Sequence, residues 1–526
     1  MLEVGCLEYE QPIAMPKKLL LDLYRCAQVK SLDARAIADQ TVSGFTLMTR
    51  AGQAAFSSIQ KRWPTIKKMH VFCGGGNNAG DGYIIAALAA EASWQVQIHC
   101  LQAPDKLKGD AHKAYELAKQ HSLNIGAFDP HQNIESLDNQ HDTIIVDALL
   151  GIGLKGNIRG SYPSAIELIN TLSVPVFSVD IPSGVCGDTG AILGDAVRAD
   201  MTMSFIGLKK GLFTGSATEY CGDVLYDDLG VEPEIFATET PSCQILEFST
   251  PLLSKRPRNS HKGMFGHVLV VGGDDGYGGA GILSAESALL TGAGMVTLAT
   301  KPEHIAASLT RRPEVMVKGI HSKEDLQPLL DSADIIVLGP GLGQSSWSHA
   351  MFEQCCEVNK HMVIDADGLN LLSTNQHDYA PRQSWILTPH PGEAARLLNT
   401  STSAVQTNRF AAVKELQQRY GGTCVLKGAG SLIAYTTANT KPFSEKQSHS
   451  NCNIRVCSAG NPAMASPGMG DVLAGLIGSL LAQGLSHHLA AEMSVWAHAN
   501  AGDICAEKLG RHILASELNQ TLRSMW

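Results

Sequence analysis

The fold of the second half of this chain is decided by residues 459–482, which read AGNPAMASPGMGDVLAGLIGSLLA. A glycine-rich turn ends at Asp471 and leads directly into an apolar helix. Backbone N–H groups at such a helix start point at an anion, and a carboxylate beside them can take the proton from an attacking hydroxyl. The stretch therefore predicts an anion hole with Asp471 as a general base.

Short apolar runs alternate with loops rich in Gly, Asp and Pro through both halves of the chain. In the first half the runs are VFCGGG from Val71, VQIHCL from Val96, TIIVDALL from Thr143 and VFSVD from Val176. In the second half they are GHVLVVGG from Gly266, MVTLAT from Met295, DIIVLGPGLG from Asp334, MVIDADGLN from Met362, WILTPHPGE from Trp385 and TCVLKGAGSLI from Thr423. This alternation predicts parallel sheets wound with helices, with ligands at the carboxyl ends of the strands.

We predict an α/β protein of two domains, because 526 residues exceed what one hydrophobic core usually supports. The first is a Rossmann-like αβα sandwich over residues 16–232. Residues 233–250, in a proline-containing stretch without clear helical period, form the junction. The second, over residues 251–526, is expected to be a ribokinase-like αβα domain. Its Gly-Asp helix start best matches that arrangement, and the chain has no GxxxxGK(S/T) loop and no HRD or DFG set.

Composition excludes several classes of function. A net charge of -10 with no long Lys or Arg run argues against nucleic-acid binding, so an anionic ligand must be held locally by backbone N–H groups. The 13 cysteines include no CxxC pair, which favours reduced thiols in the cytoplasm. No signal peptide and no membrane span are expected, because early acidic residues and polar interruptions break every apolar run.

Three loops of the first half carry polar side chains beside glycine-rich backbone. They read GGGNNAGDGY at residues 74–83, DALLGIGLKGNIRG at 147–160 and VDIPSGVCGDTG at 179–190. The first differs from the GxGxxG fingerprint, since two asparagines intervene and Asp81 would repel phosphate. Carboxamide, carboxylate and hydroxyl oxygens suit a hard cation, and a carboxylate near a hemiaminal carbon can shuttle a proton.

Together these loops resemble the NAD(P)HX epimerase family, the YjeF-type N-terminal domain, over residues 20–230. The resemblance implies that Asp180 is the acid/base residue and that Asn78, Asp147 and Ser183 hold a potassium ion. It further implies a substrate site formed by Asn77, Asn78, Ala79, Gly80, Asp81, Gly151, Ile152, Gly153, Leu154, Lys155, Gly156, Asn157 and Asp180.

Two positions depart from the commoner epimerase loop. Ala79 stands where Gly is expected, and Ile152 stands where Thr is frequent. If the backbone at residue 79 has positive φ, its Cβ costs on the order of 1 kcal/mol, which a packed loop can absorb. We therefore expect epimerase activity to survive.

The second half resembles the ADP-dependent NAD(P)HX dehydratases over residues 252–516, through HKGMFGHVLVVGG from His261, DADGLN from Asp365, TPHPGE from Thr388, VLKGAGSLI from Val425 and NPAMASPGMGD from Asn461. The family's GGMGD is altered here by Pro467. The resemblance implies that Asp471 is the general base and that Mg²⁺ bridges the phosphates of ADP. It places the hydrated dinucleotide against Ala280, Gly343, His390 and Asp471, and the adenine nucleotide against Lys427, Gly428, Ala429, Gly430, Ser431 and Gly470.

The two halves predict one metabolic task. An epimerase would interconvert the R and S forms of hydrated NADH and NADPH, and the dehydratase would return the S form to NADH or NADPH while ADP becomes AMP and phosphate. We expect a homo-oligomer with small-molecule substrates, no nucleic acid and no membrane. The alternative is a ribokinase-like vitamin or thiazole kinase fused to a non-catalytic ligand- or partner-binding N-terminal module.

Two further features have no assigned role. A polar stretch over residues 436–455 resembles an insertion before the Gly-Asp turn. His487, His488 and Glu492 form only a weak metal pattern, because a third ligand and the HExxH order are missing.

Overall fold

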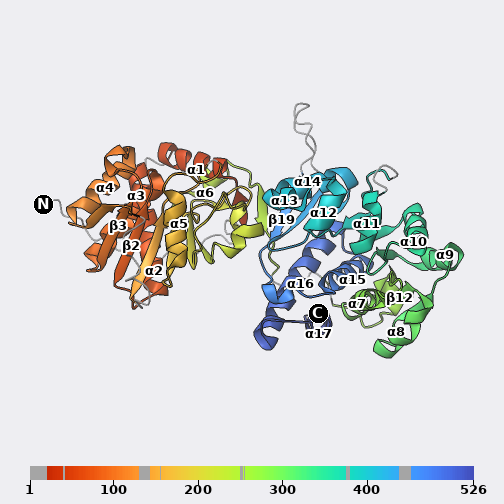
Figure 1. Cartoon of the computed structure of the whole chain (residues 1–526). Coiled ribbons are helices and arrows are strands. Elements are labelled where there is room, and N and C mark those ends of the chain that lie inside the picture. The colour runs from red at the N-terminus through yellow and green to blue at the C-terminus, as the bar shows by residue number, and fades with distance from the viewer. Residues whose placement is uncertain are drawn as a thin grey trace, which may run out of the picture. The chain divides into compact units, whose positions relative to one another are not determined.

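The computed structural model describes residues 21–39, 42–129, 142–154, 156–248, 253, 255–374, 379–436 and 452–525. They divide into two compact units (Figure 1). The first unit runs to Asp188 and also takes in Ile192–Leu212 and Glu219–Ile245. The second unit comprises Thr189–Ala191, Phe213–Thr218 and the chain from Leu246 onward. The chain enters the second unit for the last time between Ile245 and Leu246.

The first unit is built on a seven-stranded sheet with the order β4-β3-β2-β5-β6-β7-β9. All its strand pairs are parallel. The strands are β2 (Lys68–Cys73), β3 (Gln95–Cys100), β4 (Asn124–Ala127), β5 (Thr143–Ala148), β6 (Val176–Val179), β7 (Met201–Phe205) and β9 (Asp223–Asp227). The strands predicted at Val71, Val96, Thr143 and Val176 are therefore confirmed.

Helices cover both faces of this sheet. Residues of α1 (Cys26–Asp39), α2 (Gly44–Arg62), α3 (Asn77–Glu91) and α4 (Gly109–Gln120) share one core, whereas α5 (Tyr162–Thr171) packs in another. Short strands β1 (Asp22–Tyr24) and β8 (Leu208–Lys209) pair in parallel, and β10 (Cys243–Ile245) pairs antiparallel with β1. The short helix α6 (Pro233–Phe236) precedes β10. The predicted αβα sandwich is thereby confirmed.

The second unit has strands in the order β13-β12-β11-β14-β15-β16-β17-β18-β19. Pairing is parallel as far as β17 and antiparallel for β18 and β19. The strands are β11 (His267–Val271), β12 (Met295–Thr300), β13 (Met316–Gly319), β14 (Ile335–Leu338), β15 (His361–Ile364), β16 (Trp385–Leu387), β17 (Thr423–Leu426), β18 (Ser431–Thr436) and β19 (Cys452–Cys457). Each predicted run of the second half contains one of these strands. Most of the polar stretch 436–455 lies outside the described residues.

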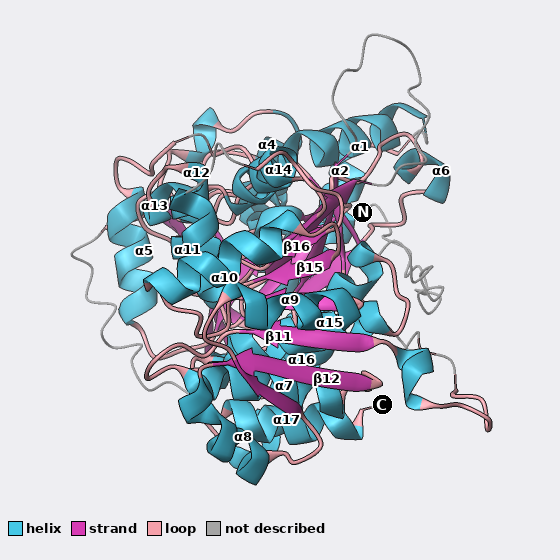
Figure 2. Cartoon of the chain, turned by 90° about the vertical axis from the view of Figure 1, so that its right-hand side faces the viewer, coloured by secondary structure: helices cyan, strands magenta, loops and turns pink. Residues whose placement is uncertain are grey.

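Helices flank these strands on either side, as Figure 2 shows around β11, β12, β15 and β16. The helices are α7 (Gly278–Leu290), α8 (Ile305–Arg311), α9 (Lys323–Ser332), α10 (Ser346–Glu357), α11 (Ala366–Thr374), α12 (Pro391–Leu398), α13 (Thr402–Thr407), α14 (Arg409–Tyr420), α15 (Met469–Ala482), α16 (His487–Leu509) and α17 (Ala515–Ser524). The predicted apolar helix is α15, which packs on α7 and on three central strands. Among the described residues, no helix is long and apolar enough to cross a bilayer.

Candidate active sites

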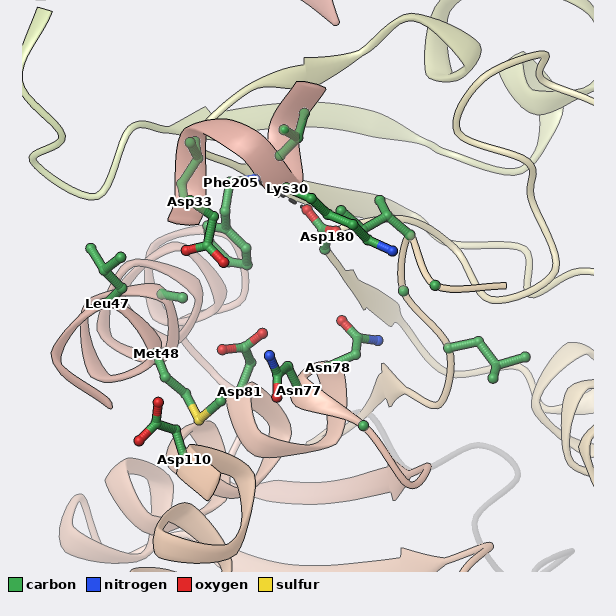
Figure 3. A pocket seen from close by; sticks show the side chains of 18 of the residues that line it. Lys30, Asp33, Leu47, Met48, Asn77, Asn78, Asp81, Asp110, Asp180 and Phe205 are labelled. Carbon is green, nitrogen blue, oxygen red and sulfur yellow. Dashed lines mark hydrogen bonds between the residues drawn. The ribbon is translucent and has the colours of Figure 1, made fainter. Parts of the chain in front are cut away.

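A cavity of about 590 Å³ opens in the first unit where β2, β5 and β6 end. Because carboxyl ends of parallel strands meet at one sheet edge, the three polar loops of the sequence come together here. Figure 3 shows side chains from α1, α3 and the end of β6 directed into the cavity. Its lining includes these members of the predicted substrate site: Asn77, Asn78, Asp81, Gly151, Ile152, Gly153, Leu154 and Asp180.

Asp180 follows β6 directly and has a left-handed backbone, with φ of 67°. Such a conformation at a residue other than glycine costs on the order of 1 kcal/mol and occurs often at functional sites. The Asp180 carboxylate forms an ion pair with Lys209 and accepts a hydrogen bond of 3.3 Å from the Phe205 backbone N–H. Several contacts thus fix a strained residue in the cavity wall.

Lys209 is a buried cation that the sequence analysis did not single out. Its side chain is 1% exposed. Besides Asp180, its ammonium group donates to Ser204 Oγ at 3.1 Å and to the Phe205 carbonyl at 3.0 Å. A buried ammonium needs partners of this kind, so the lysine and Asp180 hold each other in place.

Other carboxyl groups face the same cavity. Burial, followed by repulsion from Asp180 and Asp33, raises the pKa of Asp81 well above its usual range. Burial and repulsion from Asp180 also raise the pKa of Asp33 on α1. The cavity therefore places two carboxyl groups with raised pKa near the Asp180–Lys209 ion pair.

Asp147 lies beneath the cavity at the end of β5 and is fully buried. Its Oδ1 accepts from Ser183 Oγ at 2.6 Å, and its Oδ2 accepts from the Ser183 N–H at 2.9 Å. The Ser183 hydroxyl lies 3.2 Å from the Leu150 carbonyl.

Asn78 lies in the cavity wall, and its buried Nδ2 makes no hydrogen bond. Because an amide can be turned by 180°, this orphan atom marks a place where the Asn78 carbonyl oxygen could face a cation instead.

Some residues predicted to line the substrate lie elsewhere. Ala79 and Gly80 are buried in the first turn of α3. Ala79 is helical and does not have positive φ, so the condition under which its Cβ would carry a backbone cost is not met. Gly156 and Asn157 are not part of the described cavity lining. Lys155 lies outside the described residues.

In the second unit, Lys427 and Asp365 form an ion pair at the carboxyl ends of β17 and β15. The Lys427 Nζ to Asp365 Oδ1 distance is 2.6 Å, and Asp365 is 1% exposed. The Thr388 hydroxyl donates to the same oxygen at 2.7 Å. The sequence motif DADGLN contains Asp365, but only the structure shows that Asp365 pairs with Lys427.

The predicted Gly-Asp turn starts α15 beside this ion pair. Gly468 precedes the helix with φ of 88°, a conformation that favours glycine. A methyl group on Gly470 would lie 3.2 Å from Lys427 Nζ and 3.5 Å from Asp365 Oδ2. Asp471 follows in the first turn, where burial and repulsion from Asp365 raise its pKa to about 7. The structure therefore brings together a lysine, the backbone N–H groups of a helix start and a carboxylate whose pKa is raised to about 7.

Lys427 also opens the β17–β18 hairpin that contains the predicted adenine-nucleotide residues Lys427, Gly428, Ala429, Gly430 and Ser431. Gly428 and Gly430 have positive φ. The buried Arg409 guanidinium donates to the carbonyls of Leu426 at 3.3 Å and Lys427 at 3.2 Å. This contact fixes the start of the hairpin loop.

The other predicted dinucleotide contacts lie in neighbouring loops. His390 caps α12: its Nδ1 accepts from the Gly392 N–H at 3.0 Å, and Glu393 reaches back to the His390 N–H at 2.7 Å. Burial raises the pKa of Glu393 to about 7. Gly343, after β14, has φ of 71° and donates to Asp367 Oδ2 at 2.9 Å. Ala280 lies in the first turn of α7.

The weak metal pattern on α16 does not come together. His487 contacts His361 at 3.0 Å, His488 stacks on Tyr435, and Glu492 accepts from Arg455. Across the described part of the chain, no group of three or more His, Cys, Asp or Glu side chains is arranged to hold a metal ion.

The fold and these two sites define a class: an α/β protein of two units, each with charged side chains gathered at the carboxyl ends of parallel strands. Comparison with known proteins identifies the family. Residues 44–211 match the model of the YjeF-related protein N-terminus, and residues 268–524 match that of NAD(P)H-hydrate dehydratase. The chain belongs to the bifunctional NAD(P)H-hydrate repair enzymes.

Relatives of this family resemble the chain over nearly its whole length. The bifunctional NAD(P)H-hydrate repair enzyme Nnr of Coxiella burnetii is 42% identical over 95% of this chain and 98% of its own. The enzyme of the same name from Escherichia coli is 41% identical over 91% of this chain and 89% of its own. The solved ADP/ATP-dependent NAD(P)H-hydrate dehydratase of Bacillus subtilis is 26% identical, with a TM-score of 0.44, and covers 52% of this chain and 93% of that one.

Proposed function

We propose that the first half interconverts the R and S forms of hydrated NADH and NADPH, and that the second half dehydrates the S form while ADP becomes AMP and phosphate. The observation that carries this proposal is the 42% identity to a bifunctional repair enzyme across both halves. The alternative of a vitamin or thiazole kinase with a non-catalytic first domain is not supported, because the named relatives span both domains.

In the dehydration, Asp471 takes the proton of the ring hydroxyl as that oxygen attacks the terminal phosphorus of ADP. AMP leaves, and the hydroxyl becomes a phosphate ester. The carbon–oxygen bond then breaks with loss of phosphate, and the neighbouring ring carbon loses a proton, so that the dihydronicotinamide double bond returns. A pKa near 7 suits this role, since the carboxylate can accept a proton at neutral pH.

The residues around α15 divide between the two ligands of this reaction. Lys427 and the helix-start N–H at Gly470 suit the phosphates, because both donate and both carry positive charge or dipole. We assign the adenine nucleotide to Lys427, Gly428, Ala429, Gly430, Ser431 and Gly470, and the hydrated dinucleotide to Ala280, Gly343, His390 and Asp471.

Magnesium fits the chemistry of this second site. Asp365, Glu393 and Asp471 would offer carboxylate oxygens one or two at a time, since no three of these groups are arranged around one ion among the described residues. Burial raises the pKa of both Glu393 and Asp471 to about 7. Mg²⁺ commonly binds through one or two carboxylates together with substrate phosphates, so these residues suit it only with nucleotide present. When bound, the ion neutralises charge on the phosphates.

In the epimerisation, Asp180 acts as the acid/base residue at the hemiaminal carbon of the substrate. The support is its position in the cavity wall beside the buried Lys209. The substrate residues are those of the three polar loops: Asn77, Asn78, Ala79, Gly80, Asp81, Gly151, Ile152, Gly153, Leu154, Lys155, Gly156 and Asn157. Ala79 and Gly80, which are buried, contribute to substrate binding through their backbone.

A potassium ion fits the oxygens below this cavity. Asn78, with its orphaned amide nitrogen, together with Asp147 and Ser183, forms an oxygen-rich set that suits a hard cation. When bound, such an ion supplies fixed positive charge beside the loop that contacts the substrate.

Two reciprocal variants test the proposal, each serving as the other's control. Purified protein is mixed with both epimers of hydrated NADH, Mg²⁺, K⁺ and ADP, and the absorbance of restored dihydronicotinamide is followed. Asp180→Asn should convert the S epimer at the wild-type rate but leave the R epimer to its slow spontaneous conversion. Asp471→Asn should interconvert the epimers and restore no absorbance.

Two results would contradict these assignments. Unchanged epimer interconversion in Asp180→Asn removes Asp180 from catalysis. A stable phosphorylated alcohol formed from ATP, with no recovery of absorbance, replaces the dehydratase by a kinase.

A further inference from the structure

Asp33 on α1 contributes a carboxyl group to the epimerase cavity. The residue is half-buried and lines the cavity together with Asp180. Figure 3 shows its carboxyl pointing into the space that the carboxyl groups of Asp81 and Asp180 also face. It precedes residues 44–211, the segment that matches the family model, and it stands in none of the three polar loops of the sequence.

Asp33 and Asp180 differ in their surroundings. Asp180 is paired with the buried Lys209. Among the described residues, the Asp33 carboxyl makes no hydrogen bond or ion pair, although its helix is well packed. Burial and repulsion from Asp180 and Asp110 raise its pKa, while Lys209 lowers it. The cavity lining therefore holds both a charge-paired carboxylate and a carboxyl group that retains its proton more readily.

Epimerisation needs groups of this unequal kind. If the ring stays closed, hydroxyl leaves the hemiaminal carbon from one face and water adds to the other face. The departing hydroxyl needs a proton, and the incoming water must lose one, so each face requires its own acid–base group. A single residue suffices only if the ring opens, the carbonyl carbon turns, and the same oxygen closes the ring again.

We propose that Asp33 is the second acid–base residue of the epimerase and acts on the face opposite to Asp180. The proposal rests on the function given above. Asp33 protonates the departing hydroxyl, the carbon–oxygen bond breaks, and the ring nitrogen's electron pair forms an iminium ion. Water then adds to the other face and gives its proton to Asp180. Water is released and taken up in equal amounts, no oxidation occurs, and the reverse reaction uses the two residues in exchanged roles.

The main test compares Asp33→Asn with Asp39→Asn, the same change at an exposed position of the same helix. Interconversion of purified epimers is measured in the full-length protein without ADP or ATP, so the dehydratase is silent. A positioned acid contributes about 100-fold or more, so kcat for Asp33→Asn should fall at least about 100-fold with little change in KM. Asp39→Asn should stay within twofold of wild type, and Asp33→Glu should recover part of the loss.

A second measurement uses wild-type protein in ¹⁸O-labelled water. The closed-ring route requires that each inversion introduce one solvent oxygen at the hemiaminal carbon, beyond the uncatalysed exchange.

Three outcomes would overturn the proposal. The first is an Asp33→Asn variant that still interconverts the epimers at the wild-type rate. The second is an Asp33→Asn variant with raised KM and unchanged kcat. The third is wild-type inversion in ¹⁸O-labelled water that retains the original oxygen. The last outcome remains decisive even if both Asp33 variants fail to fold. Wild-type protein that does not epimerise at all contradicts the proposed function itself, which separates the two failures.

Discussion

Replacing Gly470 by Ala should impair the dehydration reaction without destabilising α15. The residue occupies the first turn of the helix, where Ala is favoured over Gly by up to about 1 kcal/mol. The added methyl group would lie 3.2 Å from Lys427 Nζ, which is tighter than ordinary van der Waals contact, and 3.5 Å from Asp365 Oδ2. Lys427 is itself held at 2.6 Å from Asp365, so the lysine must shift by some tenths of an ångström.

That shift moves the cation that we assign to the phosphates of ADP. Misplacement of a reacting group by 1 Å can cost about 100-fold, so a smaller movement should lower kcat/KM for dehydration about tenfold, or about 1.4 kcal/mol of transition-state stabilisation. Dehydration is followed at varied ADP, and thermal unfolding is recorded in parallel. Epimerisation by the same preparation is the internal control and should not change.

The result that would refute this reasoning is a variant with dehydratase kcat/KM within twofold of wild type. The helix start would then lie away from the transferring phosphoryl group. A large loss of thermal stability would equally refute it, because the neighbouring side chains would then be too rigid to yield.

Three further predictions concern buried charge, helix packing and pH. Lys209→Met leaves the Asp180 carboxylate without its cation, so denaturant unfolding should show a loss of about 3 kcal/mol from the first domain; a fully stable variant with normal epimerisation would contradict the structural role of the pair. Ala79→Gly should destabilise α3 by about 1 kcal/mol, since the residue is helical and buried. The Gly that is expected at this position in the family would instead suggest that the variant is more stable, and thermal unfolding decides between the two outcomes. Dehydratase kcat/KM should fall tenfold per pH unit below about pH 7 and level off above it. The reason is that Asp471 must be deprotonated to accept the hydroxyl proton, and its pKa is raised to about 7. A kcat/KM profile that stays flat down to pH 5.5 would show that Asp471 is not the base.

The fold was largely predictable because strands of a parallel sheet covered on both faces read as continuous apolar runs. Thr143–Ala148 is buried at every position, and its sequence TIIVDA already indicated this. The short pairing of β1 with β10 joins Leu23 to Cys243 and was not predicted. Three-residue strands are too short to show a period, and their partners lie far apart in the sequence.

The candidate sites were predictable only in part. Asp180 and Asp471 stand next to glycine-rich turns, so sequence context distinguishes them from ordinary surface carboxylates. Lys209 and Asp33 have no such context, because one is the last residue of a two-residue strand and the other lies in the middle of a helix. Their relation to the cavity depends on packing between distant segments, which a single sequence does not encode locally.

The two sites use a lysine–aspartate pair for different purposes. In the first unit the buried Lys209 contacts Asp180 itself, the residue that we assign to proton transfer. In the second unit Lys427 contacts Asp365, and the proposed base Asp471 lies beside that pair with its pKa raised to about 7. If Lys427 were instead paired directly with Asp471, the lysine would lower that pKa and make the carboxylate a weaker base. Because Asp365 takes the lysine's charge, Asp471 remains able to accept a proton at neutral pH, and the lysine's remaining N–H groups can donate to phosphate.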